Sequence, residues 1–143
     1  MKTRQATIKD LKACAEIFKE EANRPPYSKN RTLKKAEERI KSYFKRFKPF
    51  VAIIDKKIIG FIIVDKDPDE KKLYINELWI SKEYQRQGLG KKILKNIEDI
   101  YKKKGIKKFY LVADTRKGGA LGFYKKQKYK VDKNMVFMEK KLK

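Results

Sequence analysis

The chain has 143 residues, which is enough for one domain that buries a core without disulfides or metal ions. It holds 40 lysines and arginines against 18 acidic residues and no histidine, which excludes His-based catalytic triads and the usual zinc sites. Any general base must therefore be a carboxylate, a tyrosine, a lysine or a chain of waters. The formal charge of +22 would attract nucleic acid, yet the lysines run from end to end without a nucleic-acid-binding motif, so nucleic acid is not the favoured partner.

Apolar periodicity and turn residues predict the elements of the chain. They are a strand over residues 2–7, helices over 8–22 and 33–47, strands over 50–54, 58–64 and 73–80, a helix over 88–104, a strand over 109–113, a helix over 120–127, and a closing hairpin over 129–132 and 135–142. Thr7 with Asp10 is a weak capping-box variant at the first helix, and Thr32 is the expected N-cap of the second. This order predicts an α/β (α+β) protein with one mixed sheet and helices on both faces.

Further features of the sequence bound the domain organisation and the compartment. No internal repeat or low-complexity linker interrupts the chain, so residues 1–143 are expected to form a single domain. Cys14 is the only cysteine, which rules out a disulfide within the chain. No apolar run approaches membrane-spanning length, and the N-terminus does not lead into the core of a signal peptide. We therefore expect a soluble, cytoplasmic protein.

The segment from Tyr74 to Leu94 carries the strongest functional signal. An apolar strand leads through a polar turn into Gly88 and Gly90 and straight on into an amphipathic helix. Such a helix start presents backbone N–H groups and the positive end of the helix dipole, which suits a phosphate-bearing ligand. The dinucleotide fingerprint lacks its third glycine, because Ile93 stands there, and the P-loop pattern fails at both ends.

Three motifs of the chain resemble one family. Gln85-x-x-Gly88-x-Gly90 after the strand resembles the acyl-CoA loop of the GNAT superfamily of N-acetyltransferases. Residues 120–129 resemble that family's later Ala-x-x-Phe-Tyr-x-Lys-x-Gly-Phe segment, with Lys128 in place of the glycine and Tyr129 in place of the phenylalanine. The opening Arg4-x-Ala6-Thr7-x-x-Asp10 is similar to a common start in the family. The resemblance therefore extends over nearly the whole chain in the family's order.

The resemblance implies a single-domain GNAT fold with acetyl-CoA as cosubstrate. The central sheet would be mixed and mostly antiparallel, with about six to seven strands, and the parallel strands over 73–80 and 109–113 would splay apart at the cofactor cleft. Main-chain groups of Leu78, Trp79 and Ile80 would hold the pantetheine, and amides of Gln85, Arg86, Gln87, Gly88, Leu89, Gly90 and Lys91 would hold the pyrophosphate. Lys117 stands where the family often has an asparagine that contacts CoA or a water.

The resemblance also implies two catalytic residues. Glu77 is the expected base that takes a proton from the acceptor amine, because such an amine is protonated at neutral pH. It shares a strand face with Trp79, so this role requires that face to look into the cleft. The alternatives are a water oriented by Asn76 and a carboxylate on the solvent face. Tyr124 is the expected acid for the departing CoA thiolate, with a core aromatic as its alternative, and a backbone N–H near Trp79 or Ile80 would polarise the thioester carbonyl.

Acceptor specificity is expected in the connection over residues 23–31 and near Asn134. Glu20, Glu21 and Tyr27 are the expected acceptor contacts, with charge from the acids and a ring contact from the tyrosine. The sequence does not choose between a polyamine, an aminoglycoside, a protein N-terminus and a lysine side chain. The acceptor is therefore a small-molecule or protein amine.

The motifs together predict an acetyl-CoA-dependent N-acetyltransferase. It would move an acetyl group to a primary amine by direct attack in a ternary complex, without a metal ion, as a monomer or a homodimer. The alternative function is a catalytically weak acyl-CoA-binding protein or a basic nucleic-acid-associated protein on the same fold. Binding of CoA with thiol release would favour the enzyme, and salt-sensitive binding of a polyanion without acyl transfer would favour the alternative.

Overall fold

The sheet has five strands in the order β1-β2-β3-β4-β5, and the computed structural model describes residues 1–116 and 119–143. The strands are β1 (Lys2–Gln5), β2 (Lys48–Ile54), β3 (Lys57–Asp67), β4 (Lys72–Ile80) and β5 (Lys108–Tyr110). β1, β2, β3 and β4 pair antiparallel in turn, and β5 pairs parallel with β4. The predicted mixed, mostly antiparallel sheet is confirmed, with fewer strands than expected.

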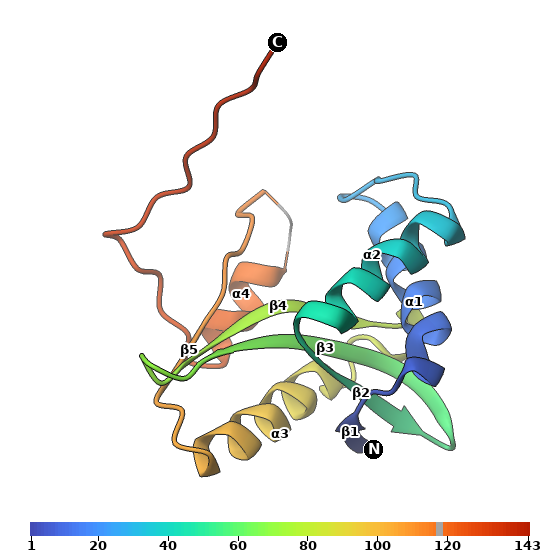
Figure 1. Ribbon diagram of the computed structural model, residues 1–143, viewed down its shortest axis with the longest axis horizontal. Helices are drawn as coiled ribbons and strands as arrows, with labels where there is room; N and C mark the ends of the chain where they lie inside the picture. The colour runs from blue at the N-terminus through green and yellow to red at the C-terminus, as the bar shows by residue number, and fades with distance from the viewer. Residues whose placement is uncertain (117–118) are drawn as a thin grey trace. The chain divides into compact units, whose positions relative to one another are not determined.

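Helices cover both faces of the sheet, as predicted (Figure 1). The helices are α1 (Leu11–Asn23), α2 (Leu33–Arg46), α3 (Leu89–Lys103) and α4 (Ala120–Lys126), with short 3-10 turns η1 (Ile8–Asp10) and η2 (Lys82–Tyr84). α1 and α2 pack on one face, where Phe18, Ile40 and Trp79 belong to one hydrophobic cluster. α3 packs on the other face, where the ring of Tyr101 meets Phe50 edge to face. Both faces of the sheet are therefore buried.

The described chain divides into two compact units, Met1–Val112 and Ala113–Lys143. The first unit contains the whole sheet with α1, α2 and α3, and the second contains α4. Within the described ranges, no helix combines the length and the apolar character that a membrane crossing requires. A single domain over residues 1–143 stays a prediction.

The closing hairpin predicted over residues 129–132 and 135–142 is wrong, because no strand follows α4 in the described chain. Its turn does form, since the Asn134 backbone N–H donates to the Asp132 carboxylate at 2.9 Å. The apolar side chains beyond the turn stay in solvent, with Phe137 81% exposed. A hairpin without further strands beside it is marginal in water, and these segments have no strand partner in the part of the chain that the structure describes.

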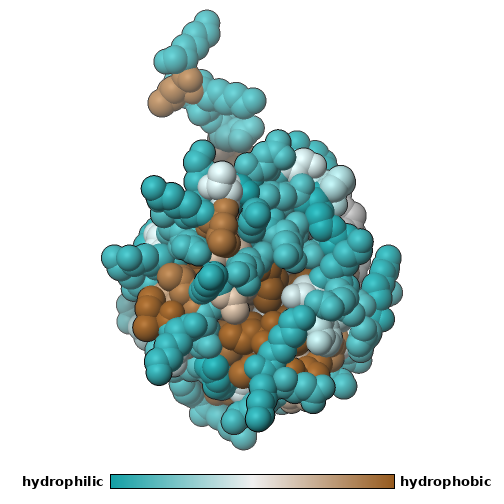
Figure 2. Space-filling model, turned by 90° about the vertical axis from the view of Figure 1, so that its right-hand side faces the viewer, coloured by the Kyte–Doolittle hydropathy of each residue, from teal (hydrophilic) through white to brown (hydrophobic). Residues whose placement is uncertain are grey.

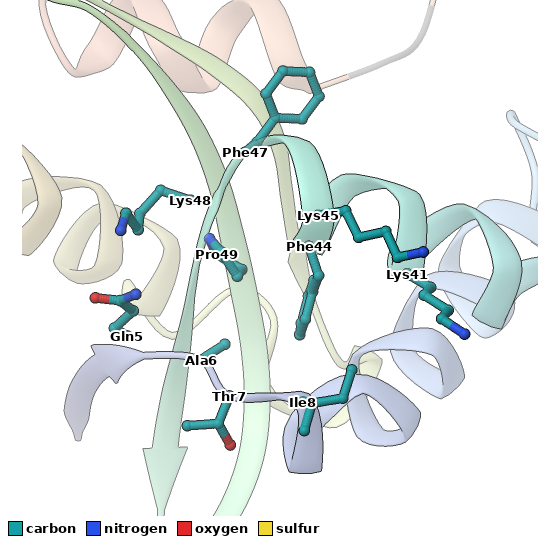
Figure 3. A pocket seen from close by; sticks show the side chains of 10 residues that line it. All are labelled: Gln5, Ala6, Thr7, Ile8, Lys41, Phe44, Lys45, Phe47, Lys48 and Pro49. Atoms are coloured by element: carbon teal, nitrogen blue, oxygen red, sulfur yellow. The ribbon is translucent and has the colours of Figure 1, made fainter.

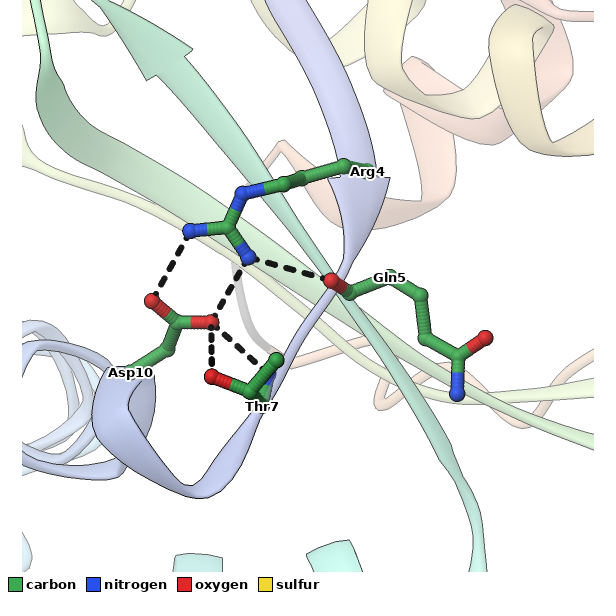
Figure 4. A network of polar contacts seen from close by, with 4 residues as sticks. All are labelled: Arg4, Gln5, Thr7 and Asp10. Atoms are coloured by element: carbon green, nitrogen blue, oxygen red, sulfur yellow. Dashed lines mark hydrogen bonds and ion pairs between the residues drawn. The ribbon is translucent and has the colours of Figure 1, made fainter.

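The turn into α1 is held by the predicted pair of Thr7 and Asp10 (Figure 4). The Thr7 backbone N–H donates to the Asp10 carboxylate at 2.8 Å, and the Arg4 guanidinium donates to it at 2.8 and 3.0 Å. The hydrogen bond from Arg4 is the main reason why the pKa of Asp10 lies below its ordinary value. Asp10 is 6% exposed, so this network joins β1 to α1 inside the fold.

Asp10→Asn is expected to lower the free energy of unfolding by about 1–2 kcal/mol near neutral pH, because it removes the charge from these hydrogen bonds. The pKa of Asp10 is lower in the folded protein than in the unfolded chain. Its stabilisation is therefore present above the ordinary carboxyl pKa of about 4 and is lost as the pH falls through the folded value. Urea unfolding of both proteins at neutral and acidic pH measures the difference. An equal deficit at both pH values would place the effect in packing instead of charge.

Gly60 lies where β3 passes close to β4. A Cβ atom here would stand 2.8 Å from the Trp79 carbonyl oxygen and 3.2 Å from a side-chain carbon of Ile80. Gly60→Ala is therefore expected to lower the free energy of unfolding by about 1–3 kcal/mol, since the β4 backbone has to move. Gly122→Ala is the control, because a Cβ there meets nothing within 4 Å. Urea unfolding tests the pair, and equal stability of Gly60→Ala and the parent chain would contradict the close approach.

Candidate active site

Strands β4 and β5 pair at one end only. Parallel pairing joins Lys72–Tyr74 to Lys108–Tyr110, and no described strand pairs with β4 on this side beyond Tyr74. Residues 75–80 of β4 therefore face an open edge, at the place where the sequence predicts splayed strands. Leu78, Trp79 and Ile80 lie in this part of β4. An open strand edge offers main-chain donors and acceptors to an extended ligand.

A β-bulge at Asn76 reverses which side chains of the second half of β4 point to each face of the sheet. Ile75 and Glu77 pair with neighbouring residues of β3, which leaves Asn76 as the extra residue. Ile63, opposite Glu77, and Trp79 belong to the hydrophobic cluster of α1 and α2, whereas Ile75 is buried outside that cluster. The bulge thus directs Glu77 and Trp79 toward α1 and α2. Oδ1 of Asn76 is itself buried and accepts no hydrogen bond from a described residue.

Glu77 is a partly buried carboxylate that accepts a hydrogen bond from Trp79. Nε1–H of Trp79 donates to its Oε2 at 2.6 Å, and the Tyr43 hydroxyl lies close enough to lower the pKa of the carboxyl group. Arg39 and Arg31 lie close enough to act on it electrostatically. Burial nevertheless outweighs these contacts and raises the pKa of Glu77 above its ordinary value. A raised pKa makes this carboxylate a stronger proton acceptor than an ordinary glutamate.

Aromatic rings pack around Trp79. Phe18 of α1 and Tyr27 of the α1–α2 connection meet it edge to face, with ring centroids 5.5 and 5.2 Å away. The guanidinium of Arg31 lies over the Phe18 ring, 5.3 Å from its centroid. Glu77 and these neighbours form the Glu77 cluster. Its members are Phe18, Tyr27, Arg31, Arg39, Tyr43, Glu77 and Trp79.

The Glu77 cluster joins residues that the sequence suggested separately and adds residues that it did not suggest. Glu77, Trp79 and Tyr27 were predicted for three different roles and lie together. Arg39 and Tyr43 were missed, although they stand four residues apart on α2, with the guanidinium 5.2 Å from the ring centroid. Such an i,i+4 pair marks one helix face, which is the signal that could have found them.

The side chain of Gln85 anchors the loop between β4 and α3. Its Nε2 donates to the Ile80 carbonyl and to the Glu21 carboxylate, both at 2.7 Å. Glu21 also accepts hydrogen bonds from Arg24 at 2.9 and 3.0 Å. The Glu21 carboxylate is thus engaged in joining α1 to this loop. Glu20, the other predicted acidic contact, is exposed.

The start of α3 follows two left-handed residues. Arg86 has φ +64° and Gly88 has φ +76°, and Gln87 between them hydrogen-bonds back to the preceding turn at 3.1 Å. The N–H groups of residues 89–91 open the helix and have no acceptor within it. A Cβ at Gly88 would meet nothing within 4 Å, so the space beside the loop is open. These features fit a pyrophosphate at the predicted loop.

Tyr124 lies in α4, within the second unit. Its ring meets Phe123 and Tyr129, with centroids 5.0 and 5.5 Å away. Lys128 has φ +72°, so it adopts the left-handed conformation for which the family motif has glycine. Lys117 lies outside the described residues. The roles expected of Tyr124 and Lys117 stay predictions.

A separate hollow of about 410 Å³ opens beside the end of α2 (Figure 3). It is lined by Gln5, Ala6, Thr7, Ile8, Lys41, Phe44, Lys45, Phe47, Lys48 and Pro49. None of these is a carboxylate, so the hollow lacks the acidic side chain that the Glu77 cluster offers. The Glu77 cluster is therefore the better candidate for chemistry.

Figure 2 shows hydrophilic side chains over most of another face of the molecule, with hydrophobic side chains gathered near its middle.

Comparison with known proteins defines the family to which the chain belongs. Residues 11–129 match the Acetyltransferase (GNAT) family, which is more than half of the chain. The chain therefore belongs to this family of acyltransferases. The family and the enzyme class predicted from the sequence are confirmed.

Three relatives illustrate the likeness. A probable N-acetyltransferase 14 from Xenopus tropicalis is 32% identical over 85 residues, which are 59% of this chain and 41% of that protein. A possible acetyltransferase from Clostridium difficile 630 has a TM-score of 0.81 at 21% identity, over 99% of this chain and 98% of that chain. The PaiA N-acetyltransferase from Thermoplasma acidophilum, in complex with coenzyme A, has a TM-score of 0.76 at 24% identity, over 92% and 90% of the two chains. The two solved structures show the shared fold. The segment that matches the Xenopus tropicalis protein spans less than half of that protein's length.

Proposed function

We propose that the chain is an acetyl-CoA-dependent N-acetyltransferase that moves an acetyl group to a primary amine by direct attack in a ternary complex. The observation that carries the proposal is Glu77, a partly buried carboxylate that the Asn76 bulge directs toward α1 and α2 beside the open edge of β4. The family supports the reaction class, and the coenzyme A complex of the PaiA neighbour supports the donor.

The donor, acetyl-CoA, supplies an activated acetyl group as a thioester. Backbone groups of Leu78, Trp79 and Ile80 at the open edge of β4 fit its pantetheine. Backbone amides of residues 86–91 at the start of α3 fit its pyrophosphate, whereas the Gln85 N–H donates to the Lys82 carbonyl at 3.1 Å. A backbone N–H near Trp79 or Ile80 then donates where negative charge develops on the reacting carbonyl oxygen.

Glu77 removes a proton from the acceptor amine. Such an amine is mostly protonated at neutral pH and cannot attack until it loses that proton. Burial raises the pKa of Glu77, and the Trp79 N–H holds one of its oxygens in place at 2.6 Å. A water oriented by Asn76 is the alternative route for the proton, because Oδ1 of Asn76 is buried and has no hydrogen-bond partner among the described residues.

Tyr124 gives its proton to the departing thiolate. A tyrosine hydroxyl is protonated at neutral pH and can therefore donate. The support for this role is the match of residues 120–129 to the family's Ala-x-x-Phe-Tyr segment. The family match continues through this segment and ends at residue 129.

The acceptor is a small-molecule or protein amine that reaches Glu77 from the α1–α2 connection. Tyr27 of that connection packs against Trp79 and is the predicted acceptor residue nearest to Glu77 along these contacts. Cys14 is buried and free, which suits the reducing cytoplasm. A monomer or a homodimer agrees with the proposal equally well.

A thermal-shift and thiol-release experiment tests the proposal. Acetyl-CoA and CoA are each expected to raise Tm saturably by several degrees, because they bind the folded chain alone. Acetyl-CoA with a panel of primary amines should then release thiol. Absence of a shift with either CoA species would overturn the proposal. A shift without thiol release would favour an acyl-CoA-binding protein, and a salt-sensitive shift with a short RNA alone would favour a nucleic-acid-associated one.

A further inference from the structure

The Glu77 cluster holds more positive charge than its carboxylate can balance. Arg39 and Arg31 both act electrostatically on Glu77. Among the described residues, neither guanidinium lies within 4.0 Å of a carboxylate oxygen, whereas Arg4 and Arg24 each do. Two guanidinium groups around one carboxylate leave a net positive site, which is suited to an anionic group of a ligand.

Arg31 is fixed in position, and one of its donors is unused. Asn23 at the end of α1 holds its backbone from both sides, accepting from the Arg31 N–H at 2.7 Å and donating to the Arg31 carbonyl at 2.8 Å. Stacking over Phe18 at 5.3 Å fixes the guanidinium. Nε of Arg31 is buried and has no hydrogen-bond partner in the described chain. A buried, unpaired donor is costly, and an anionic oxygen is its strongest partner.

Arg39 extends the same positive site to the surface. It is exposed on α2 and lies over the Tyr43 ring, 5.2 Å from the centroid. The Tyr43 hydroxyl interacts with both Glu77 and Arg39. Arg39 therefore belongs to the same group of interacting side chains as the carboxylate. Because Arg39 is exposed, an anionic group of a ligand can reach it from solvent.

We propose that the amine acceptor carries an anionic group, a carboxylate or a phosphate, that Arg31 and Arg39 bind while Glu77 faces the amine. This inference rests on the proposed function and narrows its acceptor. A polyamine brings only positive charge and would be repelled by both arginines, and the formal charge of +22 on the chain adds to that repulsion. The sequence predicts Glu21 as an acidic contact for a cationic acceptor, but its carboxylate already binds Arg24 and Gln85.

Matched pairs of acceptors test this inference by thiol release with acetyl-CoA. The pairs are glycine and glycinamide, β-alanine and β-alaninamide, and phosphoethanolamine and ethanolamine, with concentrations expressed as free amine to remove differences in basicity. We expect kcat/KM to be at least about tenfold higher for the anionic member of at least one pair, as a charged hydrogen bond allows. The carboxylate and phosphate pairs show which anion the site takes.

Three arginine variants distinguish binding of the anionic group by Arg31 and Arg39 from a general effect of the protein's positive charge. Arg39→Gln is exposed and should fold, and Arg31→Gln is the second variant. Each should lower kcat/KM for the preferred anionic acceptor through KM, by about tenfold or more beyond any loss for its neutral partner. Arg46→Gln is the matched control, because Arg46 stacks over Phe47 on the same helix at 5.1 Å. Arg46→Gln should leave kcat/KM unchanged for both the anionic and the neutral acceptor.

The outcomes distinguish this inference from the function on which it rests. Equal or better use of the neutral acceptors in all pairs would overturn it and leave the N-acetyltransferase intact. Equal loss for both members of a pair in Arg31→Gln and Arg39→Gln would overturn it as well. Binding of acetyl-CoA without acetylation of any anionic amine would also overturn it, whereas failure to bind either CoA species would overturn the proposed function itself.

Discussion

Glu77→Gln is expected to lower kcat by about 10²–10⁴-fold, the range of a general base, with little change in KM for acetyl-CoA. In the parent chain, kcat at saturating acceptor should fall on the acidic side as Glu77 takes up a proton. Because burial raises the pKa of Glu77, this fall should lie above the ordinary glutamate value of about 4.3. Steady-state thiol release over a range of pH measures both effects, and the variant should lose the acidic limb.

The loss should not come from unfolding. The pKa of Glu77 is raised in the folded protein, so the ionised carboxylate is disfavoured by folding. Its contribution to stability is present below the unfolded pKa and is lost as the pH rises through the folded pKa. Glutamine keeps an oxygen for the Trp79 N–H, so Glu77→Gln should unfold at the same or a higher urea concentration near neutral pH.

Glu98→Gln is the matched control for Glu77→Gln. Glu98 is a glutamate of α3 whose pKa burial also raises, and it lies outside the Glu77 cluster. Its variant should keep the parent kcat and the parent pH profile. Parent activity in Glu77→Gln would remove Glu77 from the chemistry and leave the water oriented by Asn76 as the base.

Tyr124→Phe is expected to lower kcat by about tenfold or more, because the departing thiolate loses its proton donor. Binding of CoA should persist, since the phenyl ring can still pack against Phe123 and Tyr129. Thiol release gives kcat, and a thermal-shift titration gives the affinity for CoA.

Tyr129→Phe is the control for the tyrosine variant. It removes a hydroxyl from the neighbouring ring, 5.5 Å away between centroids, and should leave kcat unchanged. A parent rate in Tyr124→Phe, or an equal loss in both variants, would contradict the role of Tyr124 as the acid.

Local sequence signals predicted the elements that local interactions make. Thr32 caps α2, as its Oγ1 accepts from the Lys35 N–H at 3.2 Å. Asp55 and Lys56 form the expected turn between β2 and β3, both at positive φ. Gly105 ends α3 at φ +89°, the left-handed position that favours glycine. Each of these signals depends on a few neighbouring residues, so the sequence alone contains it.

The misses arise where distant segments meet. The bulge at Asn76 exists only in the register of β4 against β3, and simple alternation along β4 does not contain it. Arg31 and Tyr43 reach Glu77 through the packing of α2 and the α1–α2 connection, which no local pattern specifies. The closing hairpin had a correct turn around Asn134 but lacked a strand partner. The sequence therefore singled out Glu77 but missed most of its surroundings, and the role of Glu77 as the base stays a prediction.

The most direct test of the proposed chemistry is the product itself. A primary amine incubated with acetyl-CoA and the chain should gain one acetyl group for each CoA thiol released, as seen by mass spectrometry of the amine and by thiol titration. The same incubation with Glu77→Gln should give neither product above background. Thiol released without acetylated amine, or acetylated amine formed equally well by Glu77→Gln, would contradict an N-acetyltransferase that uses Glu77 as its base.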